Sequence, residues 1–428
     1  MLLCATETLS GPTDLTHAYG VKQFVLTCAV AMALGGGDSA AQQTPAVPPS
    51  LTLEAALARA EAVNPAIMAA RARRTASLAE IAVARERLNP EARVELERET
   101  PTQAYGISLP LELGGKRARR IAVSTAALRT TDAEITQTIV EVRAQVRRAY
   151  FELLIADSRV ALADELRTLA TRLRDTAQQR FDAGDAPRLE VLQAQLTLAE
   201  ADNQAVAAVG IATAARTALN ALLGLPLATS VTLDTTLDAS TAPAADAALA
   251  QARTANAELM VLDRRLDEQR ARLALARALQ TPDVTPEGSI THGAEPEFNT
   301  GWRAAVGVAL PIFTRHRAGV ALEQATLTQL NAEREATLAR VTGEVAGAAA
   351  LADAQRAQYL RYRDQIVPQA LEVERLAEDS YRLGQTGIAA YLLALQSSRD
   401  VRLRSLEAAA GFQSALSDLE RAVGAPLP

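Results

Sequence analysis

The chain has 428 residues, 22% of them charged and 3% aromatic, and its 44 basic and 50 acidic side chains give a net charge of −6. This acidic balance argues against a nucleic-acid partner, which would need a net basic face. With 2 cysteines and 3 widely separated histidines, the chain offers few metal ligands or acid–base groups, so we predict no enzyme, no catalytic residue, no cofactor and no resident metal.

Residues 1–41 are predicted to be a signal peptide. Lys22 precedes an apolar run at 24–34, which is followed by small residues typical of a cleavage site before Gln42. The apolar run is too short to span a bilayer as a helix. We expect residues 1–20 to come from a misassigned start. Cleavage would remove both cysteines and leave a mature chain exported from the cytoplasm.

The rest of the chain is predicted to be one structural unit repeated in tandem. Four landmarks recur in the same order at an offset of about 190 to 200 residues, which is unlikely to arise by chance: 55–67 with 247–259, 105–110 with 306–311, 180–184 with 380–384, and 222–226 with 422–426. We therefore divide the chain into a Pro-rich linker (42–51), a first repeat (52–226), a second linker (227–245) and a second repeat (246–428).

Each repeat is predicted to contain helix, two short strands, a very long helix, a glycine turn and a further helix. In the first repeat, Pro65 suits a helix start and Asn89-Pro90 a helix stop. Apolar and other residues alternate in RVELE and YGISL, as in strands. In the second repeat the alternation is clearest from Trp302 to Leu310.

The long helix of the first repeat is predicted to run from Lys116 to Ala183, because this stretch has neither proline nor glycine. It would span roughly 100 Å. Two apolar stripes follow it on different faces, as in the wall of a tube whose helices have neighbours on both sides. The first stripe is Ile135, Ile139, Val142, Val146, Ala149, Leu153, Ala156 and Val160, and the second is Leu162, Leu166, Leu169 and Leu173.

The predicted fold class is mainly α with a small β part. A sheet that faces lipid must be a closed barrel, and four strands per chain cannot close one. Three chains would supply a 12-stranded transmembrane β-barrel, continued by long antiparallel helices as an α-barrel. The alternative is that the strands are edge hairpins on a soluble coiled coil.

Several segments resemble TolC-like outer membrane efflux proteins, over nearly all of the chain after the signal. The tip pattern, an aromatic residue three before glycine and glutamine about eleven residues later, is the most specific of them. LELGGKR is most similar to the CzcC-like branch that exports heavy-metal cations. The matching segments are LTLEAALARAEAVNPAI, LPLELGGKR, RRAYFELL, RFDAGDAPRLEVLQAQ, YRLGQTGIAAYLLALQ and LNALLGLP.

The resemblance implies a homotrimer in the cell outer membrane, in contact with its lipid, with the helical part in the periplasm. It also implies docking to a periplasmic adapter (membrane fusion) protein and to an inner-membrane pump of the resistance-nodulation-division type. The predicted function is a passive exit duct of a tripartite efflux system, with heavy-metal cations as cargo. A drug-efflux or protein-secretion duct, or a soluble periplasmic coiled-coil adapter or scaffold, are the alternatives.

Three groups of residues are candidates for function. The glycine turns would form the periplasmic tip, and so the gate or the adapter-docking site, unless they are ordinary helix caps: Phe181, Asp182, Gly184, Asp185, Glu190, Tyr381 and Gly384. A basic junction would lie at the membrane edge, unless it is a solvated turn: Lys116, Arg117, Arg119, Arg120, Arg315 and Arg317. An aromatic girdle has as candidates Tyr105, Phe298, Trp302 and Phe313, with core packing as the alternative. His292 is expected in an exposed loop.

Overall fold

The computed structural model describes residues 50–99, 101–235, 237 and 243–425. The predicted signal peptide, its cleavage site and both cysteines lie outside the described residues. The elements of the first half are β1 (Ser50–Leu51), α1 (Leu53–Val63), α2 (Pro65–Arg85), β2 (Glu91–Leu96), β3 (Gln103–Ser108), α3 (Lys116–Asp182) and α4 (Arg188–Leu222). Those of the second are β4 (Thr232–Leu233), α5 (Ala245–Ala255), α6 (Ala257–Ala278), β5 (Val284–Ala294), β6 (Phe298–Val308), α7 (Arg317–Arg361), the π-turn η1 (Tyr362–Ile366), α8 (Val367–Arg382) and α9 (Ile388–Val423).

The two halves use the same local device to join their first helices to their last. Asn64 caps α2 by accepting from the backbone N–H of Ala66 at 2.9 Å, and its amide donates to the Leu222 carbonyl at the end of α4. Asn256 caps α6 and donates to the Ala422 carbonyl of α9 at 2.8 Å. A side chain that caps one helix start and one helix end satisfies backbone groups that would otherwise lack partners.

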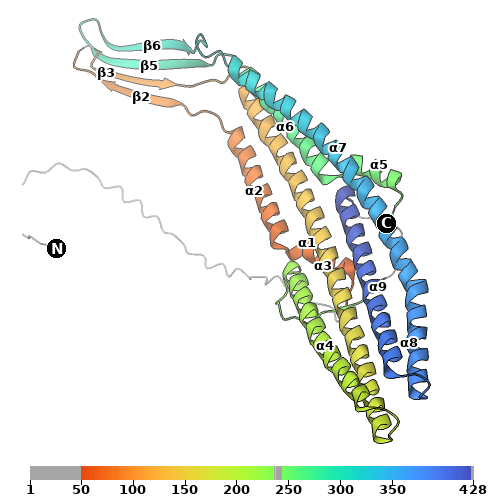
Figure 1. Cartoon of the computed structure of the whole chain (residues 1–428). Coiled ribbons are helices and arrows are strands. Elements are labelled where there is room, and N and C mark those ends of the chain that lie inside the picture. The colour runs from red at the N-terminus through yellow and green to blue at the C-terminus, as the bar shows by residue number, and fades with distance from the viewer. Residues whose placement is uncertain (1–49, 100, 236, 238–242, 426–428) are drawn as a thin grey trace, which may run out of the picture. The chain divides into compact units, whose positions relative to one another are not determined.

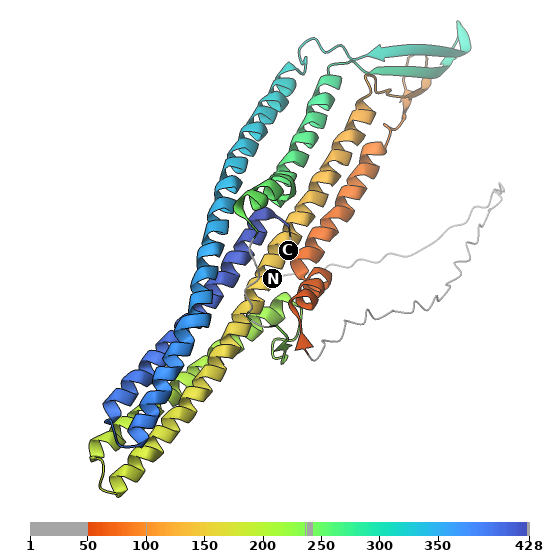
Figure 2. The same cartoon turned by 90° about the vertical axis from the view of Figure 1, so that its right-hand side faces the viewer.

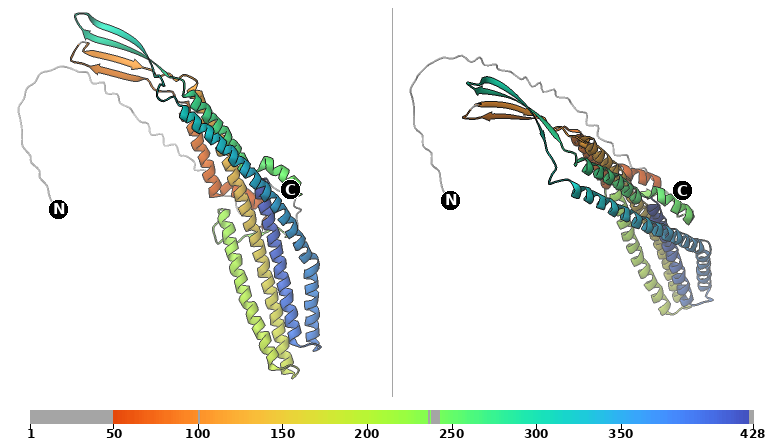
Figure 3. Two further views of the ribbon diagram at one scale, coloured as in Figure 1. Left: turned by 45° about the horizontal axis from the view of Figure 1, so that its top comes forward. Right: turned by 90° about the horizontal axis from the view of Figure 1, so that it is seen from above.

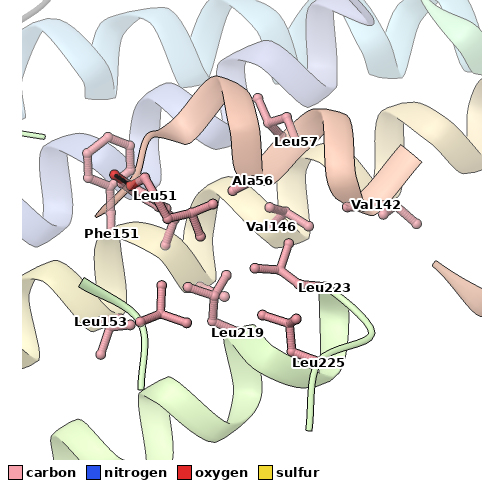
Figure 4. Packing of buried hydrophobic residues seen from close by; sticks show 14 of the residues in the cluster. Leu51, Ala56, Leu57, Val142, Val146, Phe151, Leu153, Leu219, Leu223 and Leu225 are labelled. Atoms are coloured by element: carbon pink, nitrogen blue, oxygen red, sulfur yellow. Dashed lines mark hydrogen bonds between the residues drawn. The ribbon is translucent and has the colours of Figure 1, made fainter. Parts of the chain in front are cut away.

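The 67-residue helix α3 runs without interruption and packs on both sides, as the two apolar stripes predict. The first stripe, with Val146 and Leu153, is buried in one cluster with α1 and the end of α4. Figure 4 shows Val146, Leu219 and Leu223 close together in this cluster. The second stripe packs against Leu395 of α9 through Leu162, Leu166 and Leu169. The prediction of a helix with neighbours on two faces is confirmed.

Helices α3 and α9 are also joined by a ladder of ion pairs. Arg147 lies 2.5 Å from Glu420, Arg148 lies 2.6 Å from Asp418, and Arg159 lies 3.8 Å from Glu407. Glu165 pairs with Arg402 further along. Because the α3 numbers rise as the α9 numbers fall, the two helices are antiparallel and in a constant register. The ladder ties the first half of the chain to the second.

The four predicted strands form one antiparallel sheet in the order β2-β3-β5-β6. The sheet lies at one end of the helices and the glycine turns lie at the other (Figures 1, 2 and 3). The central pair joins the halves, with Tyr105 opposite Ile290. His292 is in β5 opposite Thr300, so the prediction of a loop there is wrong. Glycine and proline around it suggested a turn, but the ladder with β6 supplies its backbone partners.

The second long helix differs from the first by an interruption. Its backbone passes from α7 through the π-turn η1 to α8, where Pro368 is the second residue. Proline has no N–H to donate to the preceding turn, and a π-turn accommodates the resulting mismatch. A short parallel pair, β1 with β4, also lay beyond the sequence-based prediction.

Candidate gate at the tip of the helices

Two glycine turns close the helical hairpins at the end away from the sheet. Gly184 has φ of 82° and Gly384 has φ of 70°, a left-handed conformation that side chains other than glycine rarely adopt. In each turn the glycine N–H donates at 3.0 Å to the carbonyl three residues earlier, that of Phe181 or of Tyr381. The two turns are therefore built alike, as their shared sequence pattern predicts.

Tyr381 is the residue that joins the two hairpins. Its side chain is 1% exposed, although its counterpart in the first repeat, Phe181, is 39% exposed. The Tyr381 hydroxyl donates to a Glu190 carboxylate oxygen at 3.0 Å. The Arg180 guanidinium lies 4.7 Å from the centre of the Tyr381 ring and donates to the Tyr381 carbonyl at 3.2 Å. One side chain thus holds α8 to both α3 and α4.

An apolar cluster surrounds this contact. Its buried members come from all four helices of the two hairpins: Leu173, Ala177, Val191, Ala194, Tyr381, Ile388 and Tyr391. Burial raises the pKa of Tyr381 to about 12, and the neighbouring Glu190 adds to the effect. Burial also raises the pKa of Tyr391. Both hydroxyls therefore stay protonated at neutral pH, and Tyr381 remains a donor to Glu190.

The other predicted tip residues lie outside this contact. Asp182 is exposed and accepts from the Gln178 amide at 2.8 Å, and Asp185 and Phe181 are exposed in the first turn. Arg180 and Tyr391 belong to this contact but were not among the tip residues predicted from the sequence. Arg180 directly precedes the aromatic residue of the tip pattern, which was a usable signal, whereas the place of Tyr391 depends on how the helices pack.

Three residues of the predicted basic junction bond to other groups of this chain, and the other three are exposed. Lys116 is buried and lies 2.7 Å from Asp283, which also accepts from the Leu113 N–H. Arg117 donates to the Arg85 carbonyl at the end of α2. Arg120 donates to the Glu86 carbonyl and pairs with Glu112, while Arg119, Arg315 and Arg317 are exposed. Part of the junction therefore joins elements of this chain to one another.

The four aromatic candidates all lie exposed at or beside the sheet. Trp302 is 83% exposed in β6 and Phe313 is 99% exposed just beyond it. Tyr105 and Phe298 are about half exposed. In this chain none of the four packs into a core, and their surface calls for an apolar environment.

Comparison with known proteins gives a family match for part of the chain. Residues 56–225 match the family described as outer membrane efflux proteins. This segment includes α3, the first glycine turn and the hairpin that carries Glu190. Residues 56–225 belong to the outer membrane efflux protein family. The resemblance expected from the sequence is thereby confirmed.

Further comparisons extend the match beyond this segment. The cobalt-zinc-cadmium resistance protein CzcC of Cupriavidus metallidurans is 29% identical, over 87% of this chain and 90% of its own length. The nickel-cobalt-cadmium resistance protein NccC of Alcaligenes xylosoxydans xylosoxydans is 28% identical, over 71% of this chain and 72% of its own. The structure of the outer-membrane channel OprN superposes with a TM-score of 0.70 at 20% identity, covering 87% of this chain and 90% of OprN, and so supports the fold.

Proposed function

We propose that this protein is the outer membrane channel of a tripartite efflux system, and that its cargo is heavy-metal cations. The observation that carries the proposal is the similarity to CzcC and NccC over most of the chain, two proteins named for metal resistance. The channel would be a passive duct. The energy for transport would come from an inner-membrane pump, joined to the duct by a periplasmic adapter protein.

The sheet supports placement in the outer membrane as part of a trimer. Among the described strands, β2 and β6 are each paired on one side only. Lipid offers no hydrogen bonds to an open strand edge, so such a sheet must close into a barrel. Three four-stranded sheets would give 12 strands, within the range of such barrels. Trp302 and Phe313 would then contact lipid, and Arg119, Arg315 and Arg317 would lie near its edge.

The helices support the same assembly. By length and composition, α4 is the one helix among the described residues that is apolar enough to cross a bilayer, which alone is weak evidence of a span. Its exposed side chains include Leu189, Leu192 and Leu196, spaced as on one helix face. Exposed leucines also occur on α8, at Leu376 for example. We assign both faces to contacts with neighbouring chains.

The tip supports a gate. Tyr381 holds the two hairpins together, so opening the tip requires breaking its contacts with Glu190 and Arg180. The exposed Asp182 and Asp185, repeated in three chains, would place rings of negative charge where cations enter. Adapter docking at the exposed turns belongs to the same proposal.

A deletion strain tests the proposal. Loss of the gene should make cells hypersensitive to Zn²⁺, Co²⁺ or Cd²⁺, and the wild-type gene should restore growth. Hypersensitivity to organic toxicants alone would point to a drug-efflux duct instead. The protein should extract from outer membranes as a heat-modifiable trimer. A soluble monomer in the periplasmic fraction would contradict the channel and favour the scaffold alternative.

A further inference from the structure

A depression lies along α3, between α4 and α9, far from the tip and from the sheet. Its volume is about 670 Å³, within the range of small-molecule pockets. Arg148, Glu152, Ile155 and Arg159 line it along α3. These positions fall on the face of α3 opposite to Tyr150 and Val146, which pack in the cluster with α1. The depression therefore lies on the other side of α3 from most of the core shown in Figure 4 and shares Phe151 with it.

Small side chains make the depression. Both flanking helices present alanine to it where larger residues would fill the space: Ala214, Ala215 and Ala218 from α4, and Ala410 from α9. The floor is formed by the apolar groups of Phe151 and Ile155. Arg147 lies 5.9 Å from the Phe151 ring centre and braces it. The depression is thus an apolar groove with Phe151 and Ile155 at its base.

Two polar atoms on its lining lack partners. Gln413 is 4% exposed, and its Oε1 has no hydrogen-bond partner among the described residues. The Nε of Arg159 is also buried without such a partner, and its Nη2 reaches Glu407 only at 3.8 Å. A buried acceptor and a buried donor left unpaired each cost free energy, which a bound molecule would recover.

The helix register gives the offset of these two residues along the helix axis. Arg148 faces Asp418 and Arg159 faces Glu407, so Gln413 lies opposite the middle of the α3 segment. Gln413 and Arg159 are then offset by about six residues, or roughly 9 Å along the helix axis. The complementary ligand has an apolar body, a hydroxyl to donate to Gln413, and an anionic group to accept from Arg159.

We propose that this depression binds a hydroxylated amphipathic organic anion, with the anionic group on Arg159, a hydroxyl on Gln413 and the apolar body over Phe151 and Ile155. This activity goes beyond passive cation conduction and does not depend on it. Arg148 is already paired with Asp418, and Glu152 also lines the depression, so the unpaired Nε of Arg159 is the group that favours an anion. A purely apolar molecule would leave Gln413 and Arg159 unpaired.

Sodium cholate is a suitable probe because it combines hydroxyls, a rigid apolar face and a carboxylate. The full chain, reconstituted in detergent-free nanodiscs, should take up labelled cholate saturably in equilibrium dialysis, at about one molecule per chain above the uptake of empty nanodiscs. Ala410→Trp, which fills the depression, should abolish the saturable uptake. Arg159→Gln and Gln413→Leu should each weaken it about tenfold. The methyl ester of cholate should bind the wild type as weakly as cholate binds Arg159→Gln.

Matched controls lie outside the depression. Arg167→Gln removes an exposed arginine further along α3, and Ala336→Trp adds the same bulk to an exposed position of α7. Both should bind cholate like the wild type. If Ala410→Trp does not assemble as the wild type does, Ser414→Trp replaces it. The proposal would be overturned if the wild type showed no saturable uptake of cholate. It would also be overturned if Ala410→Trp and Arg159→Gln took up as much cholate as the wild type. Because no metal is present in the assay, its failure would leave the efflux function untouched.

Discussion

Replacing Tyr381 with phenylalanine is expected to loosen the tip while leaving the rest of the chain intact. Phenylalanine keeps the ring, and so keeps the apolar packing and the contact with Arg180. What is lost is the 3.0 Å hydrogen bond to the Glu190 carboxylate. A hydrogen bond to a charged group contributes about 1.5 to 3 kcal/mol. If closed tips have this bond and open tips lack it, the ratio of open to closed should rise about 10- to 100-fold per chain.

Single-channel recording in planar bilayers measures this ratio. The wild type should show brief, rare openings, and Tyr381→Phe should show a larger open fraction at unchanged conductance. Tyr105→Phe is a matched control, because it removes a tyrosine hydroxyl that, among the described residues, donates to Gln103 on the same strand. Equal open fractions for Tyr381→Phe and the wild type would refute the assignment of this contact as the lock. The trimer yield of each variant excludes misassembly as the cause.

Three further predictions concern pH, the ion-pair ladder and the turns. Since burial raises the pKa of Tyr381 to about 12, its neutral hydroxyl stabilises the closed tip fully below pH 10 and loses this effect as pH rises from 10 to 12; channel opening should increase in that window in the wild type and not in Tyr381→Phe. Arg147→Gln removes the near partner of the buried Glu420, and among the described residues the next cation is Arg143 at 3.9 Å. This change should cost about 3 kcal/mol of stability, measured as a lower melting temperature. Arg148→Gln breaks an exposed ion pair and should cost less than about 1 kcal/mol. Gly384→Ala forces a left-handed backbone on alanine, at about 1 to 2 kcal/mol, and should speed hydrogen exchange in the turn, while Gly387→Ala, where φ is −77°, should not.

The long helices could be predicted from the sequence because their signal is local and long. An unbroken stretch without proline or glycine predicted α3, and its apolar stripes predicted which faces are buried. The four strands of the antiparallel sheet were predicted, but β5 extends further than expected, because its pairing with β6 overrides the turn-forming residues around His292. The π-turn was not predicted, because Pro368 is the one local sequence signal that points to an interruption there.

The site shows where local reasoning ends. The tip pattern pointed to Tyr381 and Glu190 separately, but their contact joins residues 191 positions apart and depends on how two hairpins pack. The difference between buried Tyr381 and exposed Phe181 arises for the same reason, since the two share a local pattern. Lys116 likewise owes its burial to Asp283, which lies in the other half of the chain.

The pairing of β3 with β5 has a consequence for biogenesis. Since it joins the two halves within one chain, each chain supplies a complete ribbon of four strands, in which the outer edges of β2 and β6 are left to pair with neighbouring chains. In the proposed trimer, a lone chain or a pair of chains entering the bilayer would expose those edges to hydrocarbon. Partial assemblies would therefore be unstable in the membrane. Insertion and association should therefore proceed as a single cooperative event, and cells should contain either finished channels or chains still waiting in the periplasm.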